Sequence, residues 1–153
     1  MKSISTNCNK HFDSGVFLDA EKKFSISIRN EIKDFIKMNA GGYPVKDIIV
    51  IDGEEYEIRV FLSADRKDPY FCIEKPMNFF LQKTHGKIIP IGLDSGDNYY
   101  CVNNETGKVY YWAHGEDLYY NLTATLSNFI ECFGKKSSIT YPKDIKNISD
   151  GKE

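Results

Sequence analysis

The apolar positions of this chain first repeat with a helical period. Ile28, Ile32, Phe35 and Ile36 share one face, which predicts an amphipathic helix that opens at Ser27. Two glycines and a proline follow this stretch. They predict the end of the helix, because glycine adopts positive φ readily and proline cannot continue a helix.

Downstream of this helix the period changes from 3.6 to 2, which is typical of strands. Residues 47–51 and 54–62 are predicted to form a hairpin across Asp52-Gly53, a dipeptide that favours a tight turn. A second hairpin is predicted over 98–113, and a short strand over 88–92. The return strand of the first hairpin alternates cleanly, with Tyr56, Ile58, Val60 and Leu62 on its apolar face.

Three further helical segments are expected. The first is a short turn over 19–24, and the second has Pro76 in its first turn. The third carries an apolar stripe from Leu122 to Phe133, which places Tyr119 and Tyr120 in the loop before it. This order of elements predicts an α+β fold, a single domain whose largely antiparallel or mixed β-sheet packs against several helices.

The length of 153 residues suits one domain. We expect an N-terminal segment over 1–18, the α+β domain over 19–134 and a polar tail over 135–153. A composition of 41% apolar and 27% charged residues argues against a disordered chain. The net charge of −2 argues against direct binding to nucleic acid, and no apolar run is long enough to predict a membrane span.

The cysteines indicate the compartment. Cys8, Cys72, Cys101 and Cys132 are far apart and form no C-x-x-C pair, so we expect reduced thiols. The first seven residues contain no apolar segment of the secretory type. Both observations favour a cytoplasmic protein.

Candidate catalytic and metal-binding residues are few. The histidines are His11, His85 and His114, and the oxygen-rich stretch 94–98 lacks the glutamate that completes a calcium loop. We therefore predict no cofactor and no enzymatic activity. A small enzyme or metal protein that uses Cys101 with His114 and Asp94 is the alternative that the residues leave open.

Charge and aromatic residues gather in one segment. Residues 92–133 hold six acidic residues and one basic residue, Lys108, and they contain nine of the 21 aromatic residues of the chain. Such a segment predicts an acidic aromatic surface suited to a basic protein cleft, such as that of a nuclease. The predicted partner-binding residues are Asp94, Asp97, Glu105, Tyr110, Trp112, Glu116, Asp117 and Tyr119.

Three motifs carry a resemblance to a known family. Residues 35–44, 89–101 and 107–114 read FIxxNAGGYP, IPIGxDxGDNYYC and GxVYxWxH. In this order they resemble the SUKH superfamily, in the branch that contains fungal regulators of cell-wall glucan synthesis and bacterial toxin-immunity proteins. The resemblance covers roughly residues 20 to 134. It implies an α+β fold and, for small bacterial members, binding to a cognate toxin, often a nuclease.

Three polar positions depart from the pattern of this family. Asp97 stands where a second glycine is frequent, Ala113 where an aspartate is frequent, and Asn103 where another aspartate is frequent. These changes weigh against a shared small-ligand site. We therefore expect a non-catalytic immunity protein that occludes its cognate toxin, with a regulatory or scaffold module as the alternative. We expect a monomer or a weak homodimer, because an exposed hairpin edge can pair with another copy.

Overall fold

The computed structural model describes residues 4–6, 11–39 and 41–135, and it confirms the α+β fold. This part of the chain forms four helices and ten strands. They are β1 (Ser5–Thr6), α1 (Gly15–Phe24), α2 (Asn30–Asn39), β2 (Tyr43–Pro44), β3 (Ile48–Ile51), β4 (Glu54–Glu57), β5 (Val60–Phe61), α3 (Glu74–Lys83), β6 (Ile88–Leu93), β7 (Tyr99–Asn103), β8 (Val109–Ala113), β9 (Leu118–Thr123), α4 (Leu126–Glu131) and β10 (Phe133–Lys135). Apart from Lys135, the last residue of β10, the polar tail expected over 135–153 lies outside the described residues.

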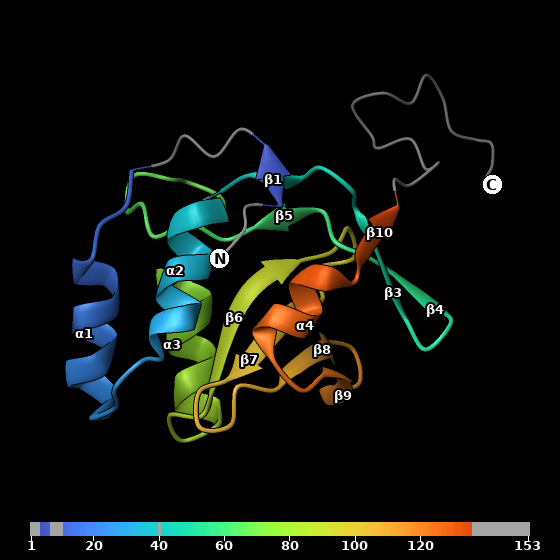
Figure 1. Ribbon diagram of the computed structural model, residues 1–153. Helices are drawn as coiled ribbons and strands as arrows, with labels where there is room; N and C mark the ends of the chain where they lie inside the picture. The colour runs from blue at the N-terminus through green and yellow to red at the C-terminus, as the bar shows by residue number, and fades with distance from the viewer. Residues whose placement is uncertain (1–3, 7–10, 40, 136–153) are drawn as a thin grey trace.

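The strands form three antiparallel sheets. The largest has the order β5-β6-β7-β8-β9, a meander in which each strand lies beside the next one in the chain. A smaller sheet has the order β10-β3-β4, and β1 pairs with β2. Figure 1 shows the three long helices to the left of the five-stranded sheet, α4 in front of its last strands and the β3–β4 hairpin projecting at the right.

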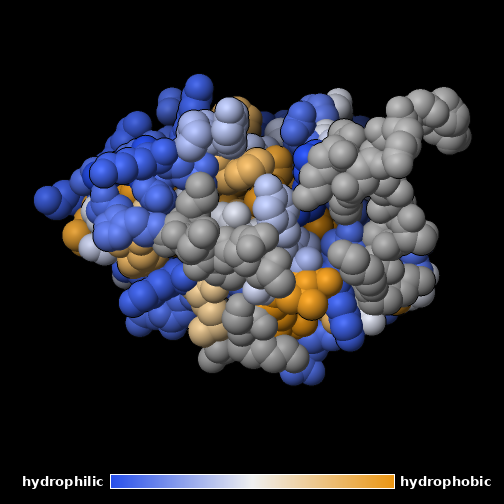
Figure 2. Space-filling model, turned by 90° about the horizontal axis from the view of Figure 1, so that it is seen from above, coloured by the Kyte–Doolittle hydropathy of each residue, from blue (hydrophilic) through white to orange (hydrophobic). Residues whose placement is uncertain are grey.

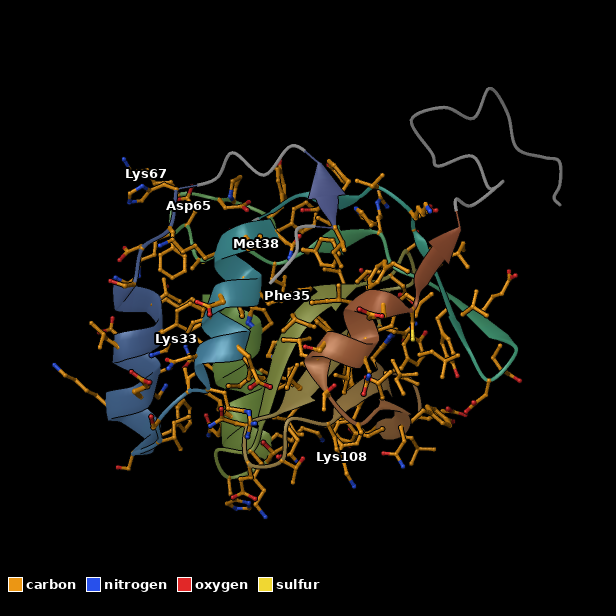
Figure 3. The ribbon with its side chains drawn as sticks, viewed as in Figure 1. Lys33, Phe35, Met38, Asp65, Lys67 and Lys108 are labelled. Carbon is orange, nitrogen blue, oxygen red and sulfur yellow. The ribbon has the colours of Figure 1, made fainter. Side chains whose placement is uncertain are left out.

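One face of the five-stranded sheet belongs to the main hydrophobic core. Helix α2 contributes Ile32, Phe35 and Ile36 to this core, and none of the three is exposed. Phe35 points from α2 toward the centre of the molecule (Figure 3). The predicted apolar stripe of α2 is therefore confirmed as the inner face of this helix. Helices α1, α3 and α4 supply further buried side chains to the same core.

The opposite face of the sheet is covered only in part. Phe80 of α3 packs there against Ile88, Cys101 and Trp112, and these four residues form a second, smaller cluster. The ring centroids of Phe80 and Trp112 are 5.0 Å apart in an edge-to-face arrangement. Both faces of the central strands are therefore apolar, and this explains why the sequence of this region is so rich in aromatic residues.

The first predicted hairpin is confirmed. Asp52 and Gly53 have φ values of 51° and 79°, so the Asp-Gly turn between β3 and β4 uses two positive φ angles. The return strand is shorter than predicted, because it ends at Glu57 and the chain resumes as β5 in the larger sheet. Helix α1 begins at Gly15, so the predicted short turn over 19–24 is the second half of a ten-residue helix.

Helix α2 begins at Asn30 and not at Ser27. The backbone amide of Ile28 donates to Glu21 Oε2 at 2.8 Å, and that of Arg29 donates to Asn104 Oδ1 at 2.9 Å. These two amides are satisfied by side chains from α1 and from the β7–β8 hairpin. These bonds therefore hold the segment before Asn30 outside the helix, although its apolar period continues into the helix.

The last predicted helix is the main error. Residues 118–123 form the strand β9, and α4 is only six residues long. Leu122 belongs to β9 and points from this strand into the core. Its four-residue spacing to Leu126 is that of a helix, but the two residues lie in different elements. Thr125 marks the true start of the helix, because its Oγ1 accepts from the backbone amide of Asn128 at 3.0 Å. Tyr119 and Tyr120 therefore lie in a strand and not in a loop.

Viewed from above in Figure 2, the side of the molecule that carries α1, at the left, is mostly hydrophilic. Hydrophobic residues appear there in separate patches among hydrophilic ones, wherever grey atoms do not cover the surface. Scattered apolar residues of this kind are normal on a protein surface. The uncovered part of this face shows no continuous apolar surface that would identify a binding site.

Tyr100 joins the two larger sheets and provides a test of the fold. Its side chain is fully buried in β7, and its hydroxyl donates to the carbonyl oxygen of Glu57 in β4 at 2.6 Å. We expect Tyr100→Phe to lower the free energy of unfolding by about 1 kcal/mol, because this part-buried hydrogen bond between the two sheets is lost. Urea denaturation measures this change. Tyr70→Phe, at a side chain that is 82% exposed, should leave stability unchanged; equal stability of both variants would contradict the role of Tyr100.

Candidate functional site

Two turns lie at the same end of the five-stranded sheet. The first, residues 94–98, joins β6 to β7, and the second, residues 114–117, joins β8 to β9. In a meander, alternate turns fall at the same end, so these two are neighbours although about twenty residues separate them in the chain. We call the surface formed by these two turns and β4 the acidic end.

Asp94 organises the first turn. Its Oδ1 accepts from the backbone amides of Gly96 at 2.8 Å and Asn98 at 2.9 Å, and its Oδ2 accepts from the Tyr111 hydroxyl at 2.6 Å. Burial, followed by this bond to Asp94, raises the pKa of Tyr111 above its usual range. Asp94 was predicted as a contact residue, but its carboxylate is largely occupied by internal bonds.

Asn98 connects the two turns. Its side-chain Oδ1 accepts from the backbone amide of His114 at 3.0 Å and lies 3.0 Å from the Nδ1 atom of the same residue. Asp97 and Asp117, one in each turn, have φ values of 64° and 54°. Aspartate tolerates this left-handed conformation better than most residues do. The result is a pair of tight turns that expose Asp97, Glu116 and Asp117.

Trp112 supports the second turn from inside. Its Nε1 donates to Asp117 Oδ1 at 2.8 Å, while Lys83 of α3 forms an ion pair with Asp117 Oδ2 at 2.6 Å. The indole is only 7% exposed, because Phe79 and Phe80 pack against it. The sequence predicted Trp112 as a contact residue, and the structure places it as a buried support for Asp117.

Three half-buried or exposed aromatic rings lie beside this support. Tyr110 and Tyr119 are half-buried, with ring centroids 6.0 Å apart, and Phe79 of α3 is 52% exposed next to Trp112. The Tyr119 hydroxyl is enclosed and has no hydrogen-bond partner among the described residues, and burial raises its pKa. Phe79 was missed by the sequence reasoning. The sequence could have indicated it, because Phe79 lies outside the apolar stripe of α3 and an aromatic side chain there is expected to be exposed.

The β3–β4 hairpin adds carboxylates that the sequence reasoning also missed. Glu57 lies against the first turn, where the backbone amide and hydroxyl of Ser95 donate to its two carboxylate oxygens at 3.0 and 2.9 Å. Glu54 and Glu55 precede it on β4 and are exposed. The acidic end therefore extends beyond residues 92–133 and includes carboxylates from a second sheet.

Glu105 lies apart from the other predicted residues. It is in the β7–β8 hairpin, at the opposite end of strands that are about 17 Å long. Asn104 fixes that hairpin, because its side chain accepts from the Arg29 amide and donates to the Ser27 carbonyl at 3.0 Å. The structure therefore does not bring Glu105 together with Asp97, and one compact surface cannot contain all eight predicted residues.

Catalysis by Cys101 and His114 finds no support in the geometry. Cys101 is fully buried in the second cluster, and burial raises the pKa of its thiol well above the usual value, which disfavours the reactive thiolate. His114 is exposed and lies against Asn98. Within the described residues, no three His, Cys, Asp or Glu side chains are grouped to hold a metal ion.

A groove of about 570 Å³ opens elsewhere, beside the start of α3. Arg66, Tyr70, Lys75 and Tyr99 are among the residues that line it. None of the eight residues predicted to bind a partner lines this groove. Charges of both signs lie along it, so it does not favour one class of charged ligand.

Comparison with known proteins identifies the family. The profile of the SMI1 / KNR4 family (SUKH-1) matches residues 13–132, which is most of the chain. The chain belongs to this family. No curated protein matches it. A solved protein from Pseudomonas syringae pv. tomato is similar, with 18% identity and a TM-score of 0.44 over 72% of this chain and 75% of that one.

Membership of the SMI1 / KNR4 family supports, in general terms, a toxin-immunity role or a regulatory role in protein–protein interaction. The family is generally non-catalytic. No helix in the described ranges is long and apolar enough to cross a membrane. Because the family acts through protein–protein interaction, we consider the acidic end as a surface that could bind another protein.

The Trp112–Asp117 bond allows a pH test. Lys83, and after it Trp112, lower the pKa of Asp117 below the usual aspartate value. Because the pKa is depressed in the folded state, the bond is present at neutral pH and is lost only as the pH falls through this lowered value. We expect the fluorescence of the one tryptophan to change with a midpoint below that of an ordinary aspartate. Lys83→Met should raise this midpoint, and a transition that survives in Asp117→Asn would contradict the assignment.

The burial of Cys101 allows a chemical test. We expect N-ethylmaleimide to modify Cys101 in the folded protein at least about 100-fold more slowly than Cys72, because Cys101 is buried and Cys72 is part-exposed. Mass spectrometry of peptides at successive times measures both rates. Unfolding in urea should make the two rates similar. Comparable rates in the folded protein would show that Cys101 is accessible.

Proposed function

We propose that this chain is an immunity protein that binds a cognate toxin domain and occludes it through the acidic end. The observation that carries the proposal is the junction of two acidic turns with the acidic strand β4, which Asp94, Asn98 and Ser95 hold together. A rigid, negatively charged surface suits a basic cleft, and a nuclease needs such a cleft to bind phosphates.

The two kinds of side chain at this surface have different tasks. Asp97, Glu116 and the glutamates of β4 attract a basic partner and raise the association rate. Tyr110, Tyr119 and Phe79 bury apolar area on contact and slow dissociation. Trp112 keeps the second turn in shape and makes no direct contact in this scheme.

A toxin domain encoded by a gene next to that of this chain would be the partner to test. Co-expression of the two should relieve the toxicity, and the two proteins should elute as one complex in gel filtration. If the wild-type pair shows neither relief of toxicity nor a complex, the proposal is wrong. A complex with another cellular protein, without any protection, would favour the regulatory role instead.

Charge reversal tests the surface itself. We expect Asp97→Lys together with Glu116→Lys to lower the association rate about 10- to 100-fold at low salt, because both carboxylates are exposed at the acidic end. Surface plasmon resonance with the toxin domain measures the rate. Glu105→Lys is the matched control for each single reversal, Asp97→Lys or Glu116→Lys, since it changes the net charge by the same amount at the opposite end of the sheet. Equal losses for Glu105→Lys would show that a diffuse charge, and not the acidic end, attracts the partner.

A further inference from the structure

The edge strands of the two larger sheets are protected to different degrees. Strand β5 has only two residues, and the amide of its Phe61 donates to the Gly42 carbonyl at 2.9 Å, so this edge is short and covered. Strand β4 carries three glutamates among its four residues, and charge of this kind discourages pairing with another strand. Both are ordinary ways in which proteins prevent edge-to-edge association.

Strand β9 has none of these protections along most of its length. Its six residues, Leu118–Thr123, include no charged residue and no proline, and β9 pairs only with β8 in the described part of the chain. The single irregularity of this pairing lies near its far end, between Val109 and Tyr110 of β8. Leu118 and Tyr120 are 50% and 43% exposed. An uncharged edge of this length with apolar side chains is suited to accept another strand.

We propose that β9 pairs in antiparallel fashion with β9 of a second copy of this chain. The two five-stranded sheets would then join into one continuous sheet of ten strands. The two-fold axis of such a pair is perpendicular to the sheet, so each face of one copy continues into the same face of the other. A pair centred on Tyr120 sets Tyr120 opposite its own copy and Leu118 opposite Leu122 of the second copy.

The distribution of charge favours a second copy in this orientation. Glu116 and Asp117 precede β9, whereas Thr123 and Thr125 at its other end are uncharged. Antiparallel pairing places the acidic turn of one copy beside the hydroxyl-bearing end of the other, so like charges do not meet. Lys108, which is exposed and points away from the molecule in Figure 3, directly precedes the neighbouring strand β8 at that same end.

This association leaves most of the acidic end uncovered. The dimer uses the edge of β9, so Tyr119 and the 114–117 turn lie at or beside it. The 94–98 turn joins β6 to β7, and the glutamates of β4 belong to the three-stranded sheet, so both lie away from that edge. Because the copies run in opposite directions, their acidic turns lie at opposite ends of the joined strands. Each copy therefore keeps its own acidic end for a partner.

Sedimentation equilibrium of the full chain, from about 1 to 200 µM, tests the proposal. We expect a concentration-dependent rise from the 17.6 kDa monomer mass to twice that mass. Hydrogen exchange should show that protection of the β9 amides rises with concentration, because pairing covers them. A chain that remains monomeric up to about 200 µM would overturn the proposal and leave β9 to a strand from another protein.

Variants locate the interface. Tyr120→Lys should raise the dimer dissociation constant at least about tenfold, because the two introduced ammonium groups face each other at the two-fold axis. Leu118→Lys, at a half-exposed position, should act in the same direction and serves if Tyr120→Lys does not fold. Tyr70→Lys is the matched control, since it adds the same charge to an exposed tyrosine beside the start of α3. A dimer that all three variants leave unchanged would place the interface elsewhere.

Discussion

The Asp94 carboxylate is the constraint on which the acidic end depends. It accepts two backbone amides of its own turn and the hydroxyl of Tyr111, whose ring packs against Tyr56 of β4 at a centroid distance of 5.8 Å. Through Asn98 the same network reaches the second turn. Two turns and a strand from another sheet are therefore held in one arrangement. Exposed carboxylates that are fixed in this way can match a partner without an ordering cost at the moment of binding.

The helices and hairpins with complete local signals were predictable. The Asp52-Gly53 turn and the buried stripe of α2 agree with the structure, because short-range chemistry determines both. The boundary between β9 and α4 was not predictable from periodicity, because Leu122 satisfies a strand and a helix equally well. The side chain of Thr125 caps the N-terminus of α4 and so marks where the strand has ended and the helix begins. This local signal was overlooked because apolar residues continue on both sides of it.

The candidate site was predictable in composition but not in arrangement. The segment 92–133 does carry much of the acidic end, yet Glu105 is separated from it because consecutive turns of a meander lie at opposite ends. The predicted hairpin over 98–113 already places Glu105 away from 94–98, and recognition of β9 as a strand would have added the 114–117 turn to the end that carries 94–98. Burial of Trp112 and the approach of Glu57 depend on α3 and β4, which are distant in sequence. No pattern within the segment could indicate these two contacts.

The last strand of the described chain returns to the first hairpin. Phe133 of β10 pairs with Ile49 of β3, and its ring packs 5.2 Å from that of Phe129. The three-stranded sheet therefore joins segments that are more than eighty residues apart, and such long loops close slowly. During synthesis on the ribosome, β3 can pair with β4 early, but it cannot pair with β10 until nearly the whole domain has emerged. Completion of this sheet is thus a late step of folding, and an immature chain would expose the Ile49 edge of β3 until then.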